Sequence, residues 1–135
     1  INDHIPIKDI ESMDDIQTMI NSFYSLAKDD DLIGKAFDGV DWDHHLPRMY
    51  RFWAFLLLNE NYDFIGNPLS KHIALHARFP LHDSHFDRWV YLFNKNIDNY
   101  FKGLKADEAK FKAFSIATTW KPKFKPGTSN LTPPI

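Results

Sequence analysis

Histidine is the residue type in this chain that offers the widest range of chemistry. Seven histidines occur and cysteine is absent. The absence of cysteine excludes a disulfide framework, a cysteine nucleophile, thiolate-bound zinc and cysteine-held iron–sulfur clusters. A metal site would therefore depend on imidazole or carboxylate ligands, although each histidine taken singly has a structural role by default.

Two of the histidines, His72 and His76, stand four residues apart. This spacing places two imidazoles on one face of a helix, where they could bind zinc. No glutamate accompanies them in a metalloprotease pattern, and Phe79-Pro80 soon interrupts the helix. A surface or core role is the simpler interpretation of the pair, and zinc is the alternative.

A second pair, His45 and His72, lies on two different predicted helices. We expect His45 on a long buried helix, and His72 on a short helix that follows a loop rich in turn residues. Such a pair can face each other across a flat cofactor, because imidazole is a common proximal ligand of haem iron and the opposite side then needs polar groups. Spacing alone does not distinguish this arrangement from two structural histidines.

The aromatic content suits two kinds of interior. Phe, Trp and Tyr make up 16 % of the residues, with 12 Phe and 4 Trp. One interpretation is a core packed with phenylalanine. The other is a cavity wall of flat rings that accepts a flat apolar ligand.

Size and charge restrict the class of protein. The chain has 135 residues, enough for one domain, and its net charge of −2 gives no reason to expect a nucleic-acid partner. The longest apolar run, Phe52 to Leu58, is far shorter than the roughly 20 residues of a membrane span. We see no secretory signal and therefore expect a cytoplasmic protein without a membrane span.

Apolar residues recur at helical spacing and no strand pattern is present, which predicts an all-α fold. The expected organisation is an N-terminal arm at 1–10, a helical domain at 11–120 and a basic, proline-rich tail at 121–135. The tail is expected to be solvated, with a weak contact site for an acidic partner or a membrane surface as the alternative.

Caps and breakers place the helix ends. Ser12 is expected to cap the first helix, Asp41 to Asp43 the second, and His82 to Ser84 the next. Gly103 is expected to stop that helix, and Asp107-Glu108 to open the last one. The last helix is expected to turn Phe111, Phe114, Ala117 and Trp120 inward.

Several motifs, taken in order, resemble the truncated haemoglobins, specifically the third of that family's three groups. The motifs are Phe23-Tyr24; His45 seven residues before Phe52-Trp53-Ala54; Gly66-x-Pro68-Leu69-x-Lys71-His72; Phe79-Pro80; and His85-Phe86-x-x-Trp89 followed by Leu92-Phe93. The resemblance covers about 10–120. The other groups carry Gly-Gly pairs, which this chain lacks.

This resemblance implies a truncated-globin fold, a two-over-two helical sandwich around b-type haem (iron protoporphyrin IX). It places His72 at the proximal iron-ligand position, and Tyr24, His45 and Trp89 at the polar distal positions. His45 would either point inward as a donor or swing outward as a gate, and the adjacent His44 leaves a one-residue shift open. The positions that contact haem in this resemblance are Phe23, Phe37, Met49, Trp53, His72 and Phe79.

The implied function is binding of O2, NO, CO or another diatomic ligand. Tyr24 lies on an apolar helix face, where its hydroxyl needs a protein partner or a polar ligand. Nitric oxide dioxygenation or peroxide reduction is the enzymatic alternative, and dioxygenation would require an external reductase. A sensor or haem-storage role and a helical domain without cofactor are the remaining alternatives.

Overall fold

The computed structural model describes residues 7–58 and 81–124. Within them the chain is helical, and an isolated bridge pairs Lys8 with Phe101. None of the described helices is long and apolar enough to cross a membrane. The elements are α1 (Met13–Ala27), η1 (Gly34–Phe37), α2 (Trp42–Leu58), α4 (Asp83–Tyr100), α5 (Leu104–Trp120) and η2 (Lys121–Phe124).

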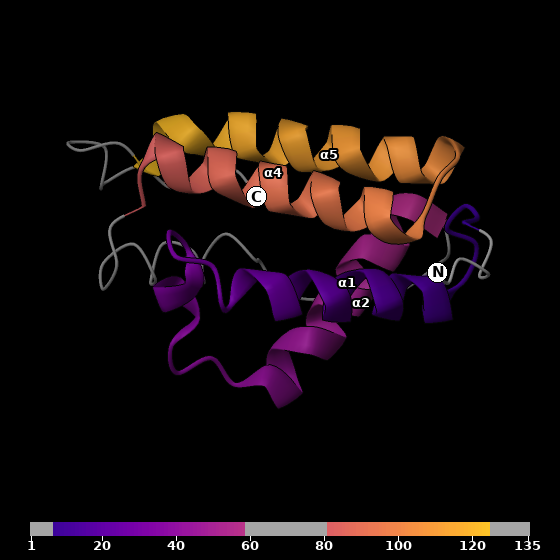
Figure 1. Cartoon of the computed structure of the whole chain (residues 1–135), viewed down its shortest axis with the longest axis horizontal. Coiled ribbons are helices and arrows are strands. Elements are labelled where there is room, and N and C mark those ends of the chain that lie inside the picture. Colours follow the sequence, from indigo (N-terminus) through magenta and orange to yellow (C-terminus); the bar gives the residue numbers. More distant parts are fainter. Residues whose placement is uncertain (1–6, 59–80, 125–135) are drawn as a thin grey trace.

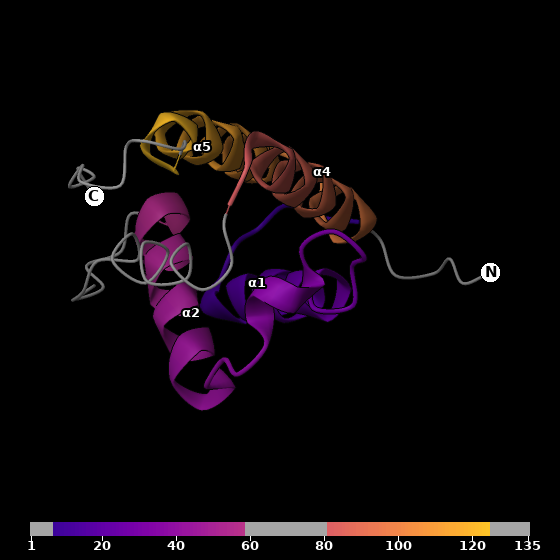
Figure 2. The same cartoon turned by 90° about the vertical axis from the view of Figure 1, so that its left-hand side faces the viewer.

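The four long helices form two layers. α4 and α5 lie side by side in one layer, and α1 and α2 cross each other in the second (Figure 1). The view at right angles shows α4 above α1 and α5 on the side of α2 (Figure 2). Helix-to-helix contacts join α1 to α2 and α4, and α5 to α4 and α2. The described residues are therefore all-α, as predicted, with two helices packed over two.

α1 follows its sequence pattern closely. The Ser12 side chain accepts a hydrogen bond from the backbone N–H of Asp15, which satisfies one of the free N–H groups at the helix start. The predicted apolar face is buried, and its buried members are Ile16, Met19, Ile20, Phe23 and Ala27. The predicted cap and the predicted face of this helix are both confirmed.

A buried polar side chain joins the two layers. Asn96 of α4 is fully buried, and its amide donates a hydrogen bond to the backbone carbonyl of Met19 at 2.9 Å. A buried amide without such a partner would cost about 1–3 kcal/mol. The bond therefore favours one alignment of α4 along α1.

α5 packs differently from the expectation. Phe111 and Phe114 are exposed by 68 % and 57 %, so their predicted inward orientation is wrong, whereas Ala117 and Trp120 are buried as predicted. The inward face consists largely of small residues, which let the α5 backbone approach its neighbours closely. The buried alanines of this face are Ala106, Ala109, Ala113 and Ala117.

The connection between α4 and α5 also differs from the expectation. Gly103 does not stop α4, which ends at Tyr100, but stands at the N-cap of α5, which opens at Leu104 rather than at Asp107. The φ angle of Gly103 is 147°, a backbone conformation that favours glycine. A Cβ atom at Gly103 would lie 2.4 Å from Cγ of Asp9. Glycine is therefore required here both by conformation and by space.

Asp9, within the predicted N-terminal arm, caps α5 from a distance. Its carboxylate accepts hydrogen bonds from the backbone N–H groups of Lys105 and Ala106, both at 2.9 Å, and of Ile10 at 2.8 Å. Burial alone would raise the pKa of Asp9, but these three donors hold it below its ordinary value. Together with the Lys8–Phe101 bridge and the buried Ile10, these bonds attach the end of the arm to the helical domain.

Replacing Asp9 by Ala is expected to lower the free energy of unfolding by about 1–2 kcal/mol, the typical effect of a lost helix cap. Because the pKa of Asp9 is lowered in the folded state, its contribution is complete above the unfolded-state value of about 3.9 and is lost as the pH falls below it. Urea unfolding at pH 7 and pH 3 measures both effects. Asp38→Ala, at an exposed carboxylate, is the control, and an equal loss in both variants would contradict the capping role.

Candidate functional site

A hydrogen bond between Tyr24 and His45 forms the centre of the candidate site. The Tyr24 hydroxyl of α1 lies 2.9 Å from Nε2 of His45 on α2, and the two rings meet edge to face at 5.1 Å. Tyr24 also packs edge to face against Phe37 and Trp42, at 5.6 and 5.2 Å. The polar pair is thus surrounded by aromatic rings from η1 and α2.

Burial sets the protonation state of Tyr24. Removal of the ring from water raises the pKa of Tyr24 well above its ordinary value, because burial disfavours the phenolate. Tyr24 is therefore a neutral phenol at neutral pH and keeps an O–H that can donate. His45 therefore supplies the hydrogen-bond partner that the Tyr24 hydroxyl needs on the apolar face of α1.

The adjacent histidine has a different environment. His44 is exposed, and its Nδ1 lies 2.6 Å from a carboxylate oxygen of Asp41 at the start of α2. The same Asp41 accepts, through its backbone carbonyl, the N–H groups of His44 and His45. His45 therefore faces Tyr24, whereas His44 faces solvent.

Trp89 lies in the aromatic cluster but not beside the Tyr24–His45 pair. Its ring packs edge to face against Phe23 at 6.0 Å and stacks on Phe93 at 5.5 Å. Phe23 in turn meets the ring of Tyr24 at 5.1 Å. Within the described residues, the half-buried Trp89 has no hydrogen-bond acceptor for its indole N–H, so this donor is available to a ligand.

The other predicted contact residues lie in or against the same core cluster. Phe23, Met49 and Trp53 are buried at 1 %, 8 % and 3 % exposure, and the half-buried Phe37 packs against them. Trp53 stacks on Phe93 at 4.9 Å, so α2 and α4 meet through these two rings. The predicted iron ligand His72 and the predicted contact Phe79 lie outside the described residues.

The sequence reasoning missed an ion pair that holds the start of α4. Asp30 accepts from Nε and Nη2 of Arg88, at 2.9 and 2.7 Å, although 58 residues separate them. The other carboxylate oxygen accepts the backbone N–H groups of Leu32 and Ile33. The Arg88 guanidinium holds the pKa of Asp30 below its ordinary value. Asp30 follows the end of α1, and Arg88 directly precedes Trp89 on α4. The ion pair between Asp30 and Arg88 therefore fixes the end of α1 relative to the turn of α4 that carries Trp89.

Each histidine of the described residues already has a structural partner. His44 is bound to Asp41 and His45 to Tyr24, while Nδ1 of His85 accepts the backbone N–H of His82 at the start of α4. The His82 and His85 rings also stack at 5.5 Å. Within 7–58 and 81–124, no group of three histidines and carboxylates could hold a metal ion.

Comparison with known proteins places this geometry in a known fold. Neither a family model nor a curated protein matches the chain. Among solved structures, the chain is similar to a crystal structure of a group III truncated hemoglobin from Campylobacter jejuni, with a TM-score of 0.77 and 24 % sequence identity. The match covers 90 % of this chain and 97 % of that chain. The predicted truncated-globin fold is therefore confirmed.

Asp30→Ala is expected to lower the free energy of unfolding by about 2–3 kcal/mol. Loss of a fully buried ion-pair partner costs about 3–5 kcal/mol. The expected loss of stability is smaller here because the Arg88 side chain is 41 % exposed, although that of Asp30 is only 5 % exposed. Urea unfolding at pH 7 measures the change.

Asp98→Ala is the matched control, since it breaks a more exposed pair with Lys110 and should cost less than about 1 kcal/mol. Equal losses in Asp30→Ala and Asp98→Ala would contradict the positioning of α4 by Asp30.

Proposed function

We propose that this chain is a haem protein that binds O2 and other diatomic ligands. The observation that carries the proposal is the Tyr24–His45 hydrogen bond, a polar pair among aromatic rings inside a truncated-globin fold. A hydrogen bond of this kind contributes only about 0.5–1.5 kcal/mol of net stability, so packing alone gives little reason for a polar pair at this position. The presence of the pair suits a ligand that carries partial charge.

His72 is the proposed proximal ligand of the haem iron. The histidines of the described residues are engaged with carboxylate, phenol or backbone groups, which leaves His4, His72 and His76 as candidates. Of these, His72 occupies the position that the sequence motif assigns to the ligand. The absence of cysteine supports a b-type haem held without thioether bonds, because covalent attachment uses a Cys-x-x-Cys-His motif.

The aromatic cluster fits a flat, apolar macrocycle. Phe23, Trp53 and Phe93 give it a buried base, in which Phe93 stacks on Trp53 at 4.9 Å and meets Phe23 edge to face at 5.4 Å. Phe37 and Met49 extend this surface toward η1 and α2. When bound, haem supplies the iron at which a diatomic ligand is held, and the protein excludes water around it.

Tyr24 is the proposed principal donor to the bound diatomic. Its raised pKa keeps the O–H in place, so the hydroxyl can donate to the partly negative end of the ligand while it accepts from Nε2–H of His45. His45 would then orient the phenol, acting through it rather than as a swinging gate. Trp89, whose N–H has no acceptor within the described residues, is the proposed second donor.

Tyr24→Phe is expected to speed O2 dissociation by about tenfold, because one hydrogen bond in a dry site contributes on the order of 1.4 kcal/mol. Trp89→Phe, which keeps the ring stacking, should speed dissociation by a smaller factor. Stopped-flow displacement of O2 by CO measures both rates. Tyr100→Phe is the control, because Tyr100 is an exposed tyrosine at the end of α4.

Unchanged dissociation rates in both Tyr24→Phe and Trp89→Phe would show that neither side chain donates to the ligand. A double-mutant cycle with His45→Leu tests the proposed orientation of Tyr24 by His45. Full additivity of Tyr24→Phe and His45→Leu would contradict it, since residues that act through one hydrogen bond are coupled.

A further inference from the structure

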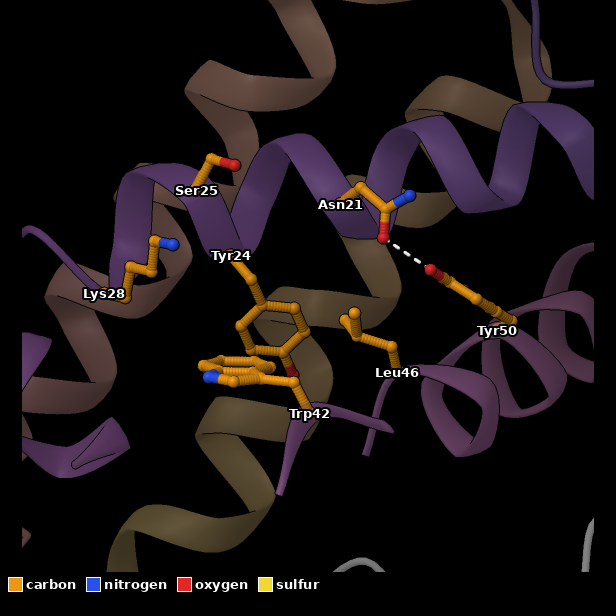
Figure 3. Close-up of a pocket in the computed structure, with 7 residues that line it drawn as sticks. All are labelled: Asn21, Tyr24, Ser25, Lys28, Trp42, Leu46 and Tyr50. Atoms are coloured by element: carbon orange, nitrogen blue, oxygen red, sulfur yellow. Dashed lines mark hydrogen bonds between the residues drawn. The ribbon is translucent and has the colours of Figure 1, made fainter. Parts of the chain in front are cut away.

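A pocket lies between α1 and α2. It has a volume of about 400 Å³, within the range of roughly 300–1,000 Å³ that is typical of small-molecule sites. We call it the α1/α2 pocket (Figure 3). Its lining residues are Asn21, Tyr24 and Ser25 of α1, the C-cap residue Lys28, and Trp42, Leu46 and Tyr50 of α2.

The two ends of the α1/α2 pocket differ in chemistry. At one end the Tyr50 hydroxyl donates to the side-chain oxygen of Asn21 at 2.5 Å, which ties the helices together there. At the other end Figure 3 shows the indole nitrogen of Trp42 on the same side as Lys28. Within the described part of the chain, Lys28 forms no ion pair, so its ammonium is available to an anion.

The walls between these ends are aromatic and rigid. Trp42 is held edge to face against Tyr24 at 5.2 Å and tilted against Phe37 at 6.0 Å. Leu46 completes the apolar middle of the pocket. A wall that is already fixed loses little conformational entropy when a flat molecule packs against it.

We propose that the α1/α2 pocket binds a small aromatic carboxylate. The flat ring would pack against Trp42 and Leu46, and the carboxylate would lie at the end that carries Lys28. A phosphate fits less well, because Lys28 is the single cationic residue among the described lining residues. Tyr24 contributes to this pocket through its ring and to the His45 pair through its hydroxyl, so the ligand would contact the back of the candidate site.

2-Naphthoate is a suitable probe of this proposal. Titration into the full-length, ¹⁵N-labelled protein, reduced and saturated with CO, should shift amide resonances of 21–28 and 42–50 with an affinity of about 1 mM or tighter. This state is diamagnetic with or without haem, so the resonances can be followed in either case. No saturable shift up to about 10 mM, or shifts confined to other helices, would overturn the proposal.

Charge variants test the anionic end. Lys28→Glu is expected to weaken 2-naphthoate binding by about fivefold or more, and the neutral analogue 2-naphthamide should bind more weakly by a similar factor. Lys95→Glu makes the same change of net charge on an exposed position of α4 and should leave binding unchanged. Equal weakening by Lys28→Glu and Lys95→Glu would contradict carboxylate binding at Lys28.

Discussion

Two consecutive aromatic residues of α1 hold the surrounding helices together. Neighbouring residues of a helix point about 100° apart, so Phe23 and Tyr24 face different partners. Phe23 packs against Trp89 and Phe93 of α4, and Tyr24 packs against Trp42 and His45 of α2. A single turn of α1 therefore connects to both layers of the sandwich, and the candidate site forms where these contacts meet.

The Tyr24–His45 bond gives this turn a polar centre within an apolar cluster. Each group would cost about 1–3 kcal/mol if it were buried without a partner, so the two side chains satisfy one another. The same bond also leaves the phenol O–H able to turn toward a ligand, because His45 can donate as well as accept. Under the proposed function, hydrogen-bond satisfaction and ligand binding would use the same pair of side chains.

Local signals allowed much of the fold to be predicted from the sequence. Ser12 before an apolar repeat places the start of α1, and Tyr24 and His45, which the sequence singles out, lie in contact. In contrast, the ion pair between Asp30 and Arg88 joins residues 58 positions apart, and nothing local to either residue indicates it.

Helical spacing gave a wrong prediction for two residues of α5. The exposed Phe111 and Phe114 follow a helical repeat, but the face that packs is a row of alanines that permits close approach to α4. Gly103 was predicted at a helix boundary but assigned to the wrong helix. A side chain is excluded at this position by the distant Asp9, which lies against Gly103. These features depend on which helices become neighbours, information that spacing within one helix does not contain.

The absorption spectrum of the purified protein, ferric and then dithionite-reduced with CO, tests the central claim most directly. We expect a strong Soret band in the wild-type protein and in His76→Ala, and loss of stable haem binding in His72→Ala. A colourless protein that takes up no added haemin would contradict haem binding. A normal spectrum in His72→Ala would contradict the assignment of His72 as the iron ligand.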